Sequence, residues 1–402
     1  MAQIKNFINS VKDYIANTDK LLWLLTLSAT VYSFILIYSL QRATDSNYLQ
    51  SQIIAVGIGI LGAIIFSVID YINLLKYWYI WAIVGILLAV SVFLFGITVT
   101  GTDDTAWIRL PGGMTFQPSE LMKICFIITF SKHLAYTVEN GLIKNIKGVL
   151  LLFIHAMIPI VIIHFQGDDG SALIFLMMFT IMAFTAGVQL RYFAITLGAV
   201  IVCIPFIWSF VMNDEHRNRI LALFDLDGNA LTDYGWQQYQ GKVSIASGGI
   251  FGSGIGKGTR VQNNIVPEQQ NDFIFTVAGE ELGFVGCIVL ILILILLMVK
   301  IIVIAIKSKD IAGRCICYGL FGMLTTQTII NLGMVLGFLP VVGITLPFFS
   351  QGGTSVMSMF FGVGLVQSVY LHNKMEIDDK LSGKYKLLLK NEFFWLRKPP
   401  YC

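Results

Sequence analysis

Charged residues are scarce in this chain. Asp, Glu, Lys and Arg together make up 13% of its 402 residues, whereas 56% of the residues are hydrophobic. Soluble globular domains carry roughly twice that share of charge, so the composition excludes a soluble protein. A cleavable signal peptide is not expected either, because the first 20 residues are polar and the apolar run that follows them is long enough to span a bilayer.

Cysteine is also scarce, and its spacing argues against disulfide bonds. None of the six cysteines belongs to a C-x-x-C pair or lies in a predicted outer loop, so we interpret them as free, small, apolar residues. His155 and His164 lie nine residues apart, without a pattern of carboxylates that would predict a metal site. The Gly-x-Ser-x-Gly motif of serine hydrolases is absent from the sequence.

The chain is instead rich in apolar segments of the length that spans a bilayer. We therefore predict an all-α polytopic membrane protein with about ten transmembrane helices and one large extracytoplasmic loop. The predicted spans are approximately 21–41, 49–69, 75–97, 119–135, 148–165, 170–187, 192–212, 273–300, 315–339 and 351–371.

The basic residues predict the orientation. Ten spans place both termini on one side, and 19 of the 27 Lys and Arg residues fall on that side, seven of them in the tail 373–402. The positive-inside rule therefore places both termini in the cytoplasm. We expect one transmembrane domain over 1–372, with an outer loop at 98–118 and a large, functional and partly helical one at 213–272. The basic tail is expected to lie on anionic lipid.

The large outer loop ends in an unusual stretch. The glycine run at 248–258 lacks the spacing of a P-loop, which would need glycine at Phe251. Two interpretations remain open, a loop whose backbone approaches a large ligand and a flexible hinge. Asp272 then stands directly before an apolar helix, and Glu280 and Glu281 follow early in that helix. Carboxylates are costly at such positions, so they point to a function.

A second polar cluster opens the fourth segment. Glu120 suits the positive end of a helix, but Lys123 lies three residues later on the same helix face. A lysine inside a bilayer costs about 2.5–3.5 kcal/mol and is best tolerated where it lines a polar cavity or meets an anion. Asp168 lies in a short turn and suits a helix cap as well as a functional site. The segment 346–355 begins with non-helical sequence and is predicted to be a kinked or re-entrant entry.

Four motifs of this chain carry a family resemblance. They are FQPSELMK at 116–123, SGGIFGSGIGKG at 247–258, PEQQNDFIFTVAGEELG at 267–283 and LPVVGITLPFFSQGGTS at 339–355. In these four motifs the chain resembles the SEDS (shape, elongation, division and sporulation) proteins, the bacterial peptidoglycan glycosyltransferases. The similarity extends over nearly the whole length of the chain. The sequence around Asn331 is more similar to the RodA branch than to the FtsW branch. The chain departs from the usual family pattern at Gly167, Asp169, Gly241, Gln270, Asn271 and Gln351.

The resemblance implies a lipid II polymerase of the bacterial cytoplasmic membrane. The acceptor GlcNAc 4-hydroxyl would attack a glycan on undecaprenyl pyrophosphate at the outer face, in one inversion that needs a base and positive charge at the leaving group. Asp272 is the expected base, and Lys123 is expected at the pyrophosphate. Glu120 would either hold Lys123 or bind a divalent cation, Mg²⁺ or Mn²⁺. The residues expected to bind substrate are Trp107, Arg109, Asp168, Lys242, Lys257 and Arg260.

The implied partner is a class B penicillin-binding protein, a transpeptidase; nucleic acid is not expected, and neither is a protein metal site. Two other functions stay open on the sequence. A flippase of lipid-linked precursors would also need a central polar cavity, but no base at the outer boundary. A non-catalytic scaffold of the elongation or division machinery would keep the fold, but it would have no need of Asp272.

Overall fold

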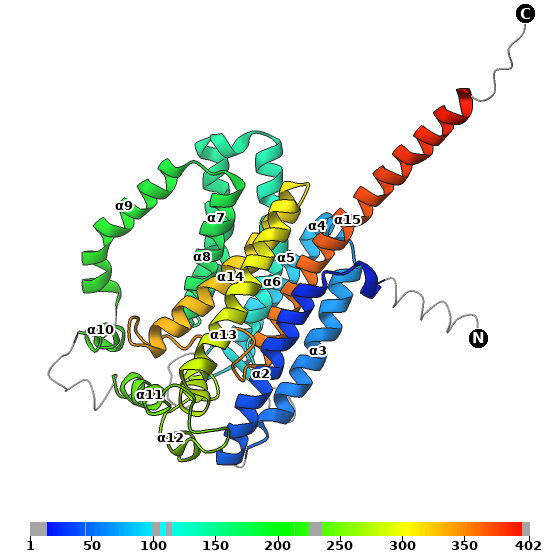
Figure 1. Ribbon diagram of the computed structural model, residues 1–402. Coiled ribbons are helices and arrows are strands. Elements are labelled where there is room, and N and C mark those ends of the chain that lie inside the picture. The colour runs from blue at the N-terminus through cyan, green and yellow to red at the C-terminus, as the bar shows by residue number, and fades with distance from the viewer. Residues whose placement is uncertain are drawn as a thin grey trace, which may run out of the picture.

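The computed structural model describes residues 14–44, 46–98, 105–109, 115–212, 214–224 and 235–395. Within these ranges ten helices are long and apolar enough to cross a membrane (Figure 1), which confirms the predicted all-α polytopic architecture. They are α2 (Lys20–Thr44), α3 (Tyr48–Val68), α5 (Trp78–Phe95), α6 (Pro118–Glu139), α7 (Ile146–His164), α8 (Asp169–Ala186), α9 (Leu190–Phe206), α13 (Ile274–Lys307), α14 (Ile311–Val335) and α15 (Gly353–Trp395).

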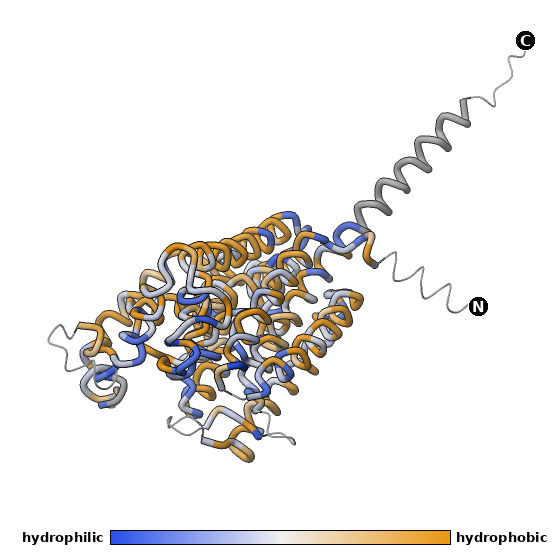
Figure 2. The backbone as a smooth tube through the Cα atoms, turned by 60° about the horizontal axis from the view of Figure 1, so that its bottom comes forward, coloured by the Kyte–Doolittle hydropathy of each residue, from blue (hydrophilic) through white to orange (hydrophobic). Residues whose placement is uncertain are grey.

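The helices differ in how deeply they lie in the bundle. Most of α6, α14 and the apolar part of α15 is buried, whereas α5 and α7 are largely exposed and α9 has no buried residue. In Figure 1, α9 stands apart from the other helices. Figure 2 shows hydrophobic positions along most of the length of the spans. A surface this apolar faces lipid, so polar side chains buried in the three central helices mark the interior of the protein.

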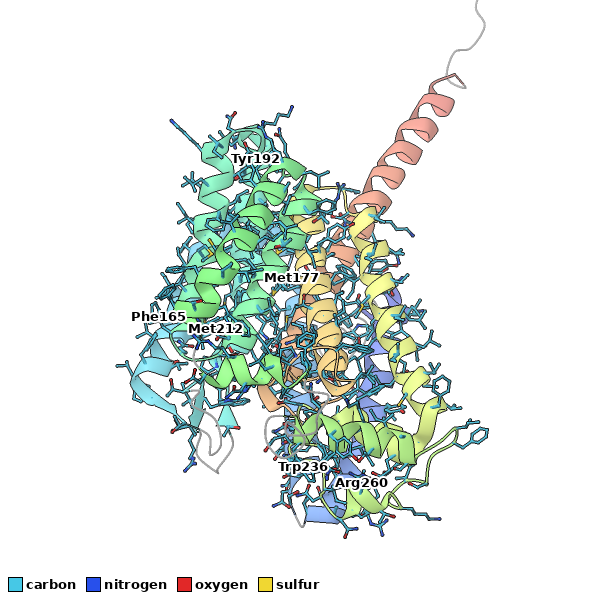
Figure 3. The ribbon with its side chains drawn as sticks, turned by 90° about the vertical axis from the view of Figure 1, so that its left-hand side faces the viewer. Phe165, Met177, Tyr192, Met212, Trp236 and Arg260 are labelled. Atoms are coloured by element: carbon cyan, nitrogen blue, oxygen red, sulfur yellow. The ribbon has the colours of Figure 1, made fainter. Side chains whose placement is uncertain are left out.

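The large loop 213–272 is partly helical, as predicted. It contains α10 (Asp214–Leu221), α11 (Trp236–Ser247) and α12 (Thr259–Gln262). These helices lie at the end of the bundle opposite the start of α2 (Figure 1), and Figure 3 shows Trp236 and Arg260 at that end, far from Tyr192. The loop is therefore a unit on one side of the membrane.

The shorter loop on the same side of the bundle contains a small sheet that the sequence did not predict. Its strands are β1 (Gly96–Ile97), β2 (Trp107–Arg109) and β3 (Thr115–Phe116). They pair antiparallel, with Gly96 opposite Ile108 and Ile108 opposite Phe116. The remaining elements are α4 (Tyr71–Lys76), a 3-10 helix (Leu142–Lys144) and a π-helix (Ile207–Val211). The sheet fixes the position of Trp107 beside the end of α5.

The last helix crosses the predicted boundary between membrane domain and tail. α15 runs without interruption from Gly353 to Trp395, so 372 is not the end of a secondary-structure element. The segment before it, 340–352, is non-helical, and Leu346, Phe348, Phe349 and Ser350 in it are buried. The predicted non-helical start of the segment 346–355 is therefore confirmed, and it is buried in protein.

Candidate active site

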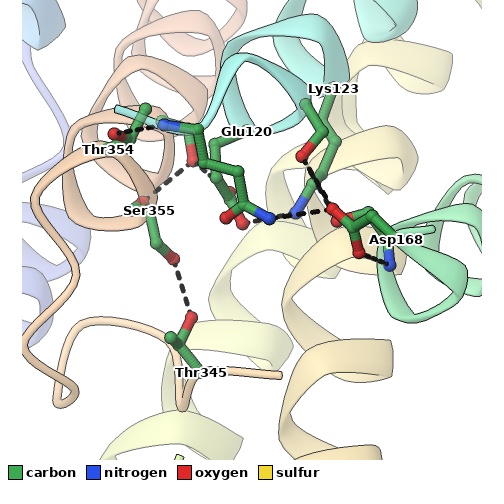
Figure 4. Close-up of polar contacts among 10 residues, drawn as sticks. Glu120, Lys123, Asp168, Thr345, Thr354 and Ser355 are labelled. Carbon is green, nitrogen blue, oxygen red and sulfur yellow. Dashed lines mark hydrogen bonds and ion pairs between the residues drawn. The ribbon is translucent and has the colours of Figure 1, made fainter. Parts of the chain in front are cut away.

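The N-terminal ends of α6, α8 and α15 meet in one hydrogen-bonded cluster (Figure 4). The backbone N–H of Gln117 donates to Thr354 Oγ1 at 3.2 Å. The Gln117 amide donates to Asp168 Oδ2 at 2.8 Å, and Ser119 Oγ donates to the same oxygen at 3.2 Å. Asp168 also caps α8, because its Oδ1 accepts the backbone N–H of Ser171 at 2.9 Å. Asp168 thus joins α6 to α8.

Glu120 and Lys123 form a buried ion pair in the first turns of α6. The distance from Lys123 Nζ to Glu120 Oε1 is 2.8 Å, and the lysine side chain is 0% exposed. The other glutamate oxygen, Oε2, accepts a hydrogen bond from Ser358 Oγ on α15 at 3.0 Å. The i, i+3 spacing predicted their common helix face, which the contact confirms. Breaking a buried pair by removing one partner leaves an uncompensated charge, which costs about 3–5 kcal/mol.

Asp272 lies at the start of α13, where the chain leaves the large loop. Its side chain is half-buried, and its carboxylate forms no hydrogen bond or ion pair with any described residue. A Cβ at Gly343 would lie 3.7 Å from Asp272 Oδ2, so the carboxylate lies against the segment before α15. Burial, and secondarily the negative charge of Glu268, raise the pKa of Asp272 from 3.8 to about 7.

The backbone around Asp272 is held by the segment before α15. Asn331 is fully buried, and its Nδ2 donates to the carbonyl oxygens of Asp272 at 2.8 Å and Ile344 at 2.7 Å. Ser350 Oγ donates to the Asn271 carbonyl at 2.5 Å. Asn331 Oδ1 is buried without a hydrogen-bond partner. Asp272 is therefore attached to α14 and to the entry of α15 at the same time.

A chain of hydrogen bonds leads from that segment to the ion pair. Thr345, which follows Ile344, shares a hydrogen bond of 3.0 Å with Ser355 Oγ. Ser358 donates to the Ser355 carbonyl at 2.8 Å and, in the contact described above, to Glu120. The entry of α15 thus carries contacts to Asp272 at one end and to Glu120 and Lys123 at the other.

Two of the predicted basic residues of the large loop lie on its helices. Lys242 is exposed on α11, and a Cβ at Gly337 would lie 3.1 Å from its Nζ. It therefore borders the segment that also reaches Asp272. Arg260 lies on α12, where its guanidinium donates to Ser244 Oγ at 2.9 Å and to Gln240. Arg260 fixes α12 to α11.

The other predicted substrate-binding residues lie further out. Lys257 is exposed in the glycine run. Arg109 is exposed on β2, two residues after Trp107, which is half-buried. They present positive charge and an aromatic ring at the loop side of the protein, without a described contact to Asp272.

Glu280 and Glu281, which the sequence singled out, have structural partners. Glu280 accepts the backbone N–H groups of Arg260 at 2.7 Å and Val261 at 3.1 Å. Glu281 Oε1 accepts from Ser39 Oγ at 2.6 Å. These carboxylates therefore hold α12 and α2 on α13. The sequence did not predict a role at Asp272 for Asn331 or Glu268. The only signal for Asn331 was an amide side chain near the end of an apolar helix.

Comparison with known proteins places this geometry in a family. A model of cell cycle proteins that groups FtsW, RodA and SpoVE matches residues 19–375. The peptidoglycan glycosyltransferase MrdB of Escherichia coli K12 is 32% identical over 360 residues, which cover 89% of this chain and 94% of MrdB. The probable peptidoglycan glycosyltransferase FtsW of Trichlorobacter lovleyi is 31% identical over 369 residues, covering 88% and 93%.

Two solved structures are similar over the same extent. One chain belongs to a peptidoglycan synthase complex that coordinates polymerization and crosslinking. It superposes with a TM-score of 0.72 at 26% identity, over 89% of this chain and 98% of its own. The rod shape determining protein RodA of Thermus thermophilus superposes with a TM-score of 0.64 at 26% identity, over 88% and 96%.

Proposed function

This chain belongs to the FtsW, RodA and SpoVE family of cell cycle proteins, and on this premise we propose that it is a peptidoglycan glycosyltransferase that polymerises lipid II with Asp272 as the general base. One observation carries the assignment of the base. The Asp272 carboxylate is half-buried, has no described partner and has a pKa raised to about 7. A base is most effective when its pKa lies near the working pH.

The proposed reaction is one inverting displacement. The 4-hydroxyl oxygen of the acceptor GlcNAc forms a bond to the anomeric carbon of the donor glycan, and its proton passes to Asp272. The bond between that carbon and the undecaprenyl pyrophosphate breaks, and the pyrophosphate leaves with the bonding electron pair. The donor is already activated, so the reaction needs no nucleotide. Donor and acceptor must be held together, and such positioning can supply about 7–11 kcal/mol of the barrier.

Positive charge is needed where the pyrophosphate departs. We assign this role to Lys123, which is buried and paired with Glu120, whose other oxygen accepts from Ser358. Lys242 borders the segment that reaches Asp272 and is the second cation on the substrate path, with Arg109, Lys257 and Arg260 further out on the loop side. Trp107 would stack on a sugar of the glycan.

A divalent cation fits this site only together with the substrate. Both Glu120 oxygens have protein partners, and the described residues contain no group of three or more His, Cys, Asp and Glu side chains placed to hold a metal ion. Mg²⁺ or Mn²⁺ would therefore bind with the pyrophosphate oxygens of lipid II, and the chain's own residues would hold the substrate rather than the ion.

The setting of the reaction is also proposed. With both termini in the cytoplasm, the loop 213–272 and Asp272 face the outside, where the lipid II head group is displayed. The similar chain in the peptidoglycan synthase complex supports a transpeptidase partner, a class B penicillin-binding protein, since that complex couples polymerization to crosslinking.

The test is polymerisation of labelled lipid II by the purified chain, resolved on a gel. Asp272→Asn keeps the shape of the side chain and removes its charge, so we expect a rate loss of about 10²–10⁴-fold with normal folding and insertion. Asp214→Asn is the matched control, because Asp214 is an exposed carboxylate of the same loop. Near-normal polymerisation by well-folded Asp272→Asn protein would remove Asp272 as the base.

A further inference from the structure

α13 is longer than a membrane crossing requires, and it is broken near one end. Its 34 residues correspond to about 51 Å at 1.5 Å per residue, whereas the hydrocarbon core is about 30 Å thick. At Gly283 the backbone is non-helical, with φ 68° and ψ −165°. Nearly all of the helix before this break is buried, and Phe284 directly after it is 63% exposed. The break therefore separates a part covered by protein from a part that faces lipid.

The glycine run of the large loop fills this break. The backbone N–H groups of Phe284 and Val285 donate to the carbonyls of Gly249 at 2.9 Å and Ile250 at 3.1 Å. In return, the N–H groups of Ser253 and Gly254 donate to the carbonyls of Glu280 and Glu281, both at 2.9 Å. The loop thus takes the place of hydrogen bonds that an unbroken helix would make with itself.

Only glycine fits at the break. A Cβ at Gly283 would lie 2.3 Å from the Gly252 nitrogen and 2.6 Å from the Ile250 oxygen, and its φ is positive. The turn 248–254 is therefore fixed against α13 at the break.

The tip of that turn is apolar and uncovered. Ile250 is 63% exposed and Phe251 is 79% exposed. Through the bond between Val285 and Ile250 the tip adjoins the exposed hydrophobic face of α13, formed by Phe284, Val285, Ile288, Val289, Leu292, Ile295, Leu296 and Val299. Because α13 crosses the membrane, this face contacts acyl chains, and the tip lies next to its first residues.

Basic groups lie in the same glycine run, a few residues after the tip, where a Cβ at Gly254 would lie 3.4 Å from Lys257 Cδ. Lys257 is exposed, and Arg42 Nη1 would lie 3.3 Å from a Cβ at Gly256. An apolar tip with lysine or arginine behind it is the arrangement of segments that insert into a membrane interface and contact phosphate head groups.

We propose that the turn 248–252 is a membrane anchor, in which Ile250 and Phe251 insert into the acyl chains of the leaflet on the loop side. The anchor would hold α11, α12 and the start of α13 at a fixed height above the bilayer, and with them the segment that ends in Asp272.

The test uses the full chain with its native cysteines replaced and one cysteine introduced for an environment-sensitive dye. Phe251→Cys and Ile250→Cys are the test positions. Asn263→Cys is the control, because Asn263 is exposed on the polar part of the same loop. Each labelled protein is placed in nanodiscs that hold a single chain, which excludes contact with a second copy. The quenching of the dye is then compared between lipids that carry the quencher in the acyl chain and lipids that carry it at the head group.

The expected result is a blue-shifted emission at positions 250 and 251, with at least threefold stronger quenching by the acyl-chain quencher than at 263. Emission and quenching equal to those at 263 would place the tip in water and overturn the proposal. Quenching by the head-group quencher alone would place the tip among the head groups, above the acyl chains, and would overturn it as well.

Discussion

The pH dependence of polymerisation tests how the site tunes Asp272. If this carboxylate is the base, kcat/KM rises with pH through about pH 7, because only the ionised form accepts the proton. Glu268 is exposed four residues earlier, and its charge is the second cause of the raised pKa. Glu268→Gln removes that charge while keeping an oxygen that can accept from Asn271 Nδ2, as Oε2 now does at 2.8 Å. The variant should therefore lower the pKa of Asp272.

The size of the change follows from the order of the two causes. Burial contributes more than Glu268 to the rise of the Asp272 pKa from 3.8 to about 7. Removing the Glu268 charge should therefore shift the rising part of the profile of kcat/KM against pH to lower pH by less than about 1.6 pH units. At pH 6 the ionised fraction, and with it kcat/KM, should increase by less than about ninefold. Above pH 8.5 the two proteins should differ little, apart from the slightly weaker basicity of a group with a lower pKa.

The assay is the initial rate of polymerisation of labelled lipid II from pH 5.5 to 9, with Asp214→Asn as the control for a lost loop charge. If the rising part of the pH profile stays in place in Glu268→Gln, or moves to higher pH, the Glu268 charge does not raise the pKa of Asp272. A wild-type profile that is flat between pH 6 and 8 would contradict the assignment of Asp272 itself.

Three further outcomes are expected. Asp272→Asn should raise Tm at pH 8 and leave it unchanged near pH 3. The folded protein keeps the Asp272 proton up to about pH 7, whereas the unfolded chain keeps it only up to about pH 3.8. The wild type therefore loses folding stability as the pH rises between these values, by at most about 4 kcal/mol before solvent screening. Removing Glu120 or Lys123 should cost similar polymerisation activity, and the double variant little more, because they act as one pair; additive losses would uncouple them. In intact spheroplasts, Asn263→Cys should react with an impermeant thiol reagent and Lys144→Cys should not; the reverse pattern would invert the topology.

The ten spans were predictable because each is a long apolar run, and length and hydropathy are properties of the local sequence. The sheet at 96–116 was not, since strands of two or three residues leave no pattern. The break at Gly283 was hidden as well. Glycine within an apolar helix is common, and what breaks this helix is the turn 248–254, which is distant in the chain.

The site shows the same division. The pairing of Glu120 with Lys123 followed from their spacing on one helix. Asp272 could be singled out because it stands directly before an apolar helix, but Glu268, whose charge adds to the raised pKa of Asp272, gave no such signal. Asn331 was not predicted, because it reaches Asp272 across 59 positions of sequence.

The bonding between the turn 248–254 and α13 also determines which parts can move separately. Four backbone hydrogen bonds cross the break, so the turn cannot lift from the helix without exposing all of them. Loop and helix therefore behave as one rigid body, and any widening that admits a polyprenyl chain has to arise elsewhere in the bundle. In hydrogen exchange, the amides of Ser253, Gly254, Phe284 and Val285 should open together at one common rate; faster exchange at 253 and 254 alone would show that the loop opens by itself.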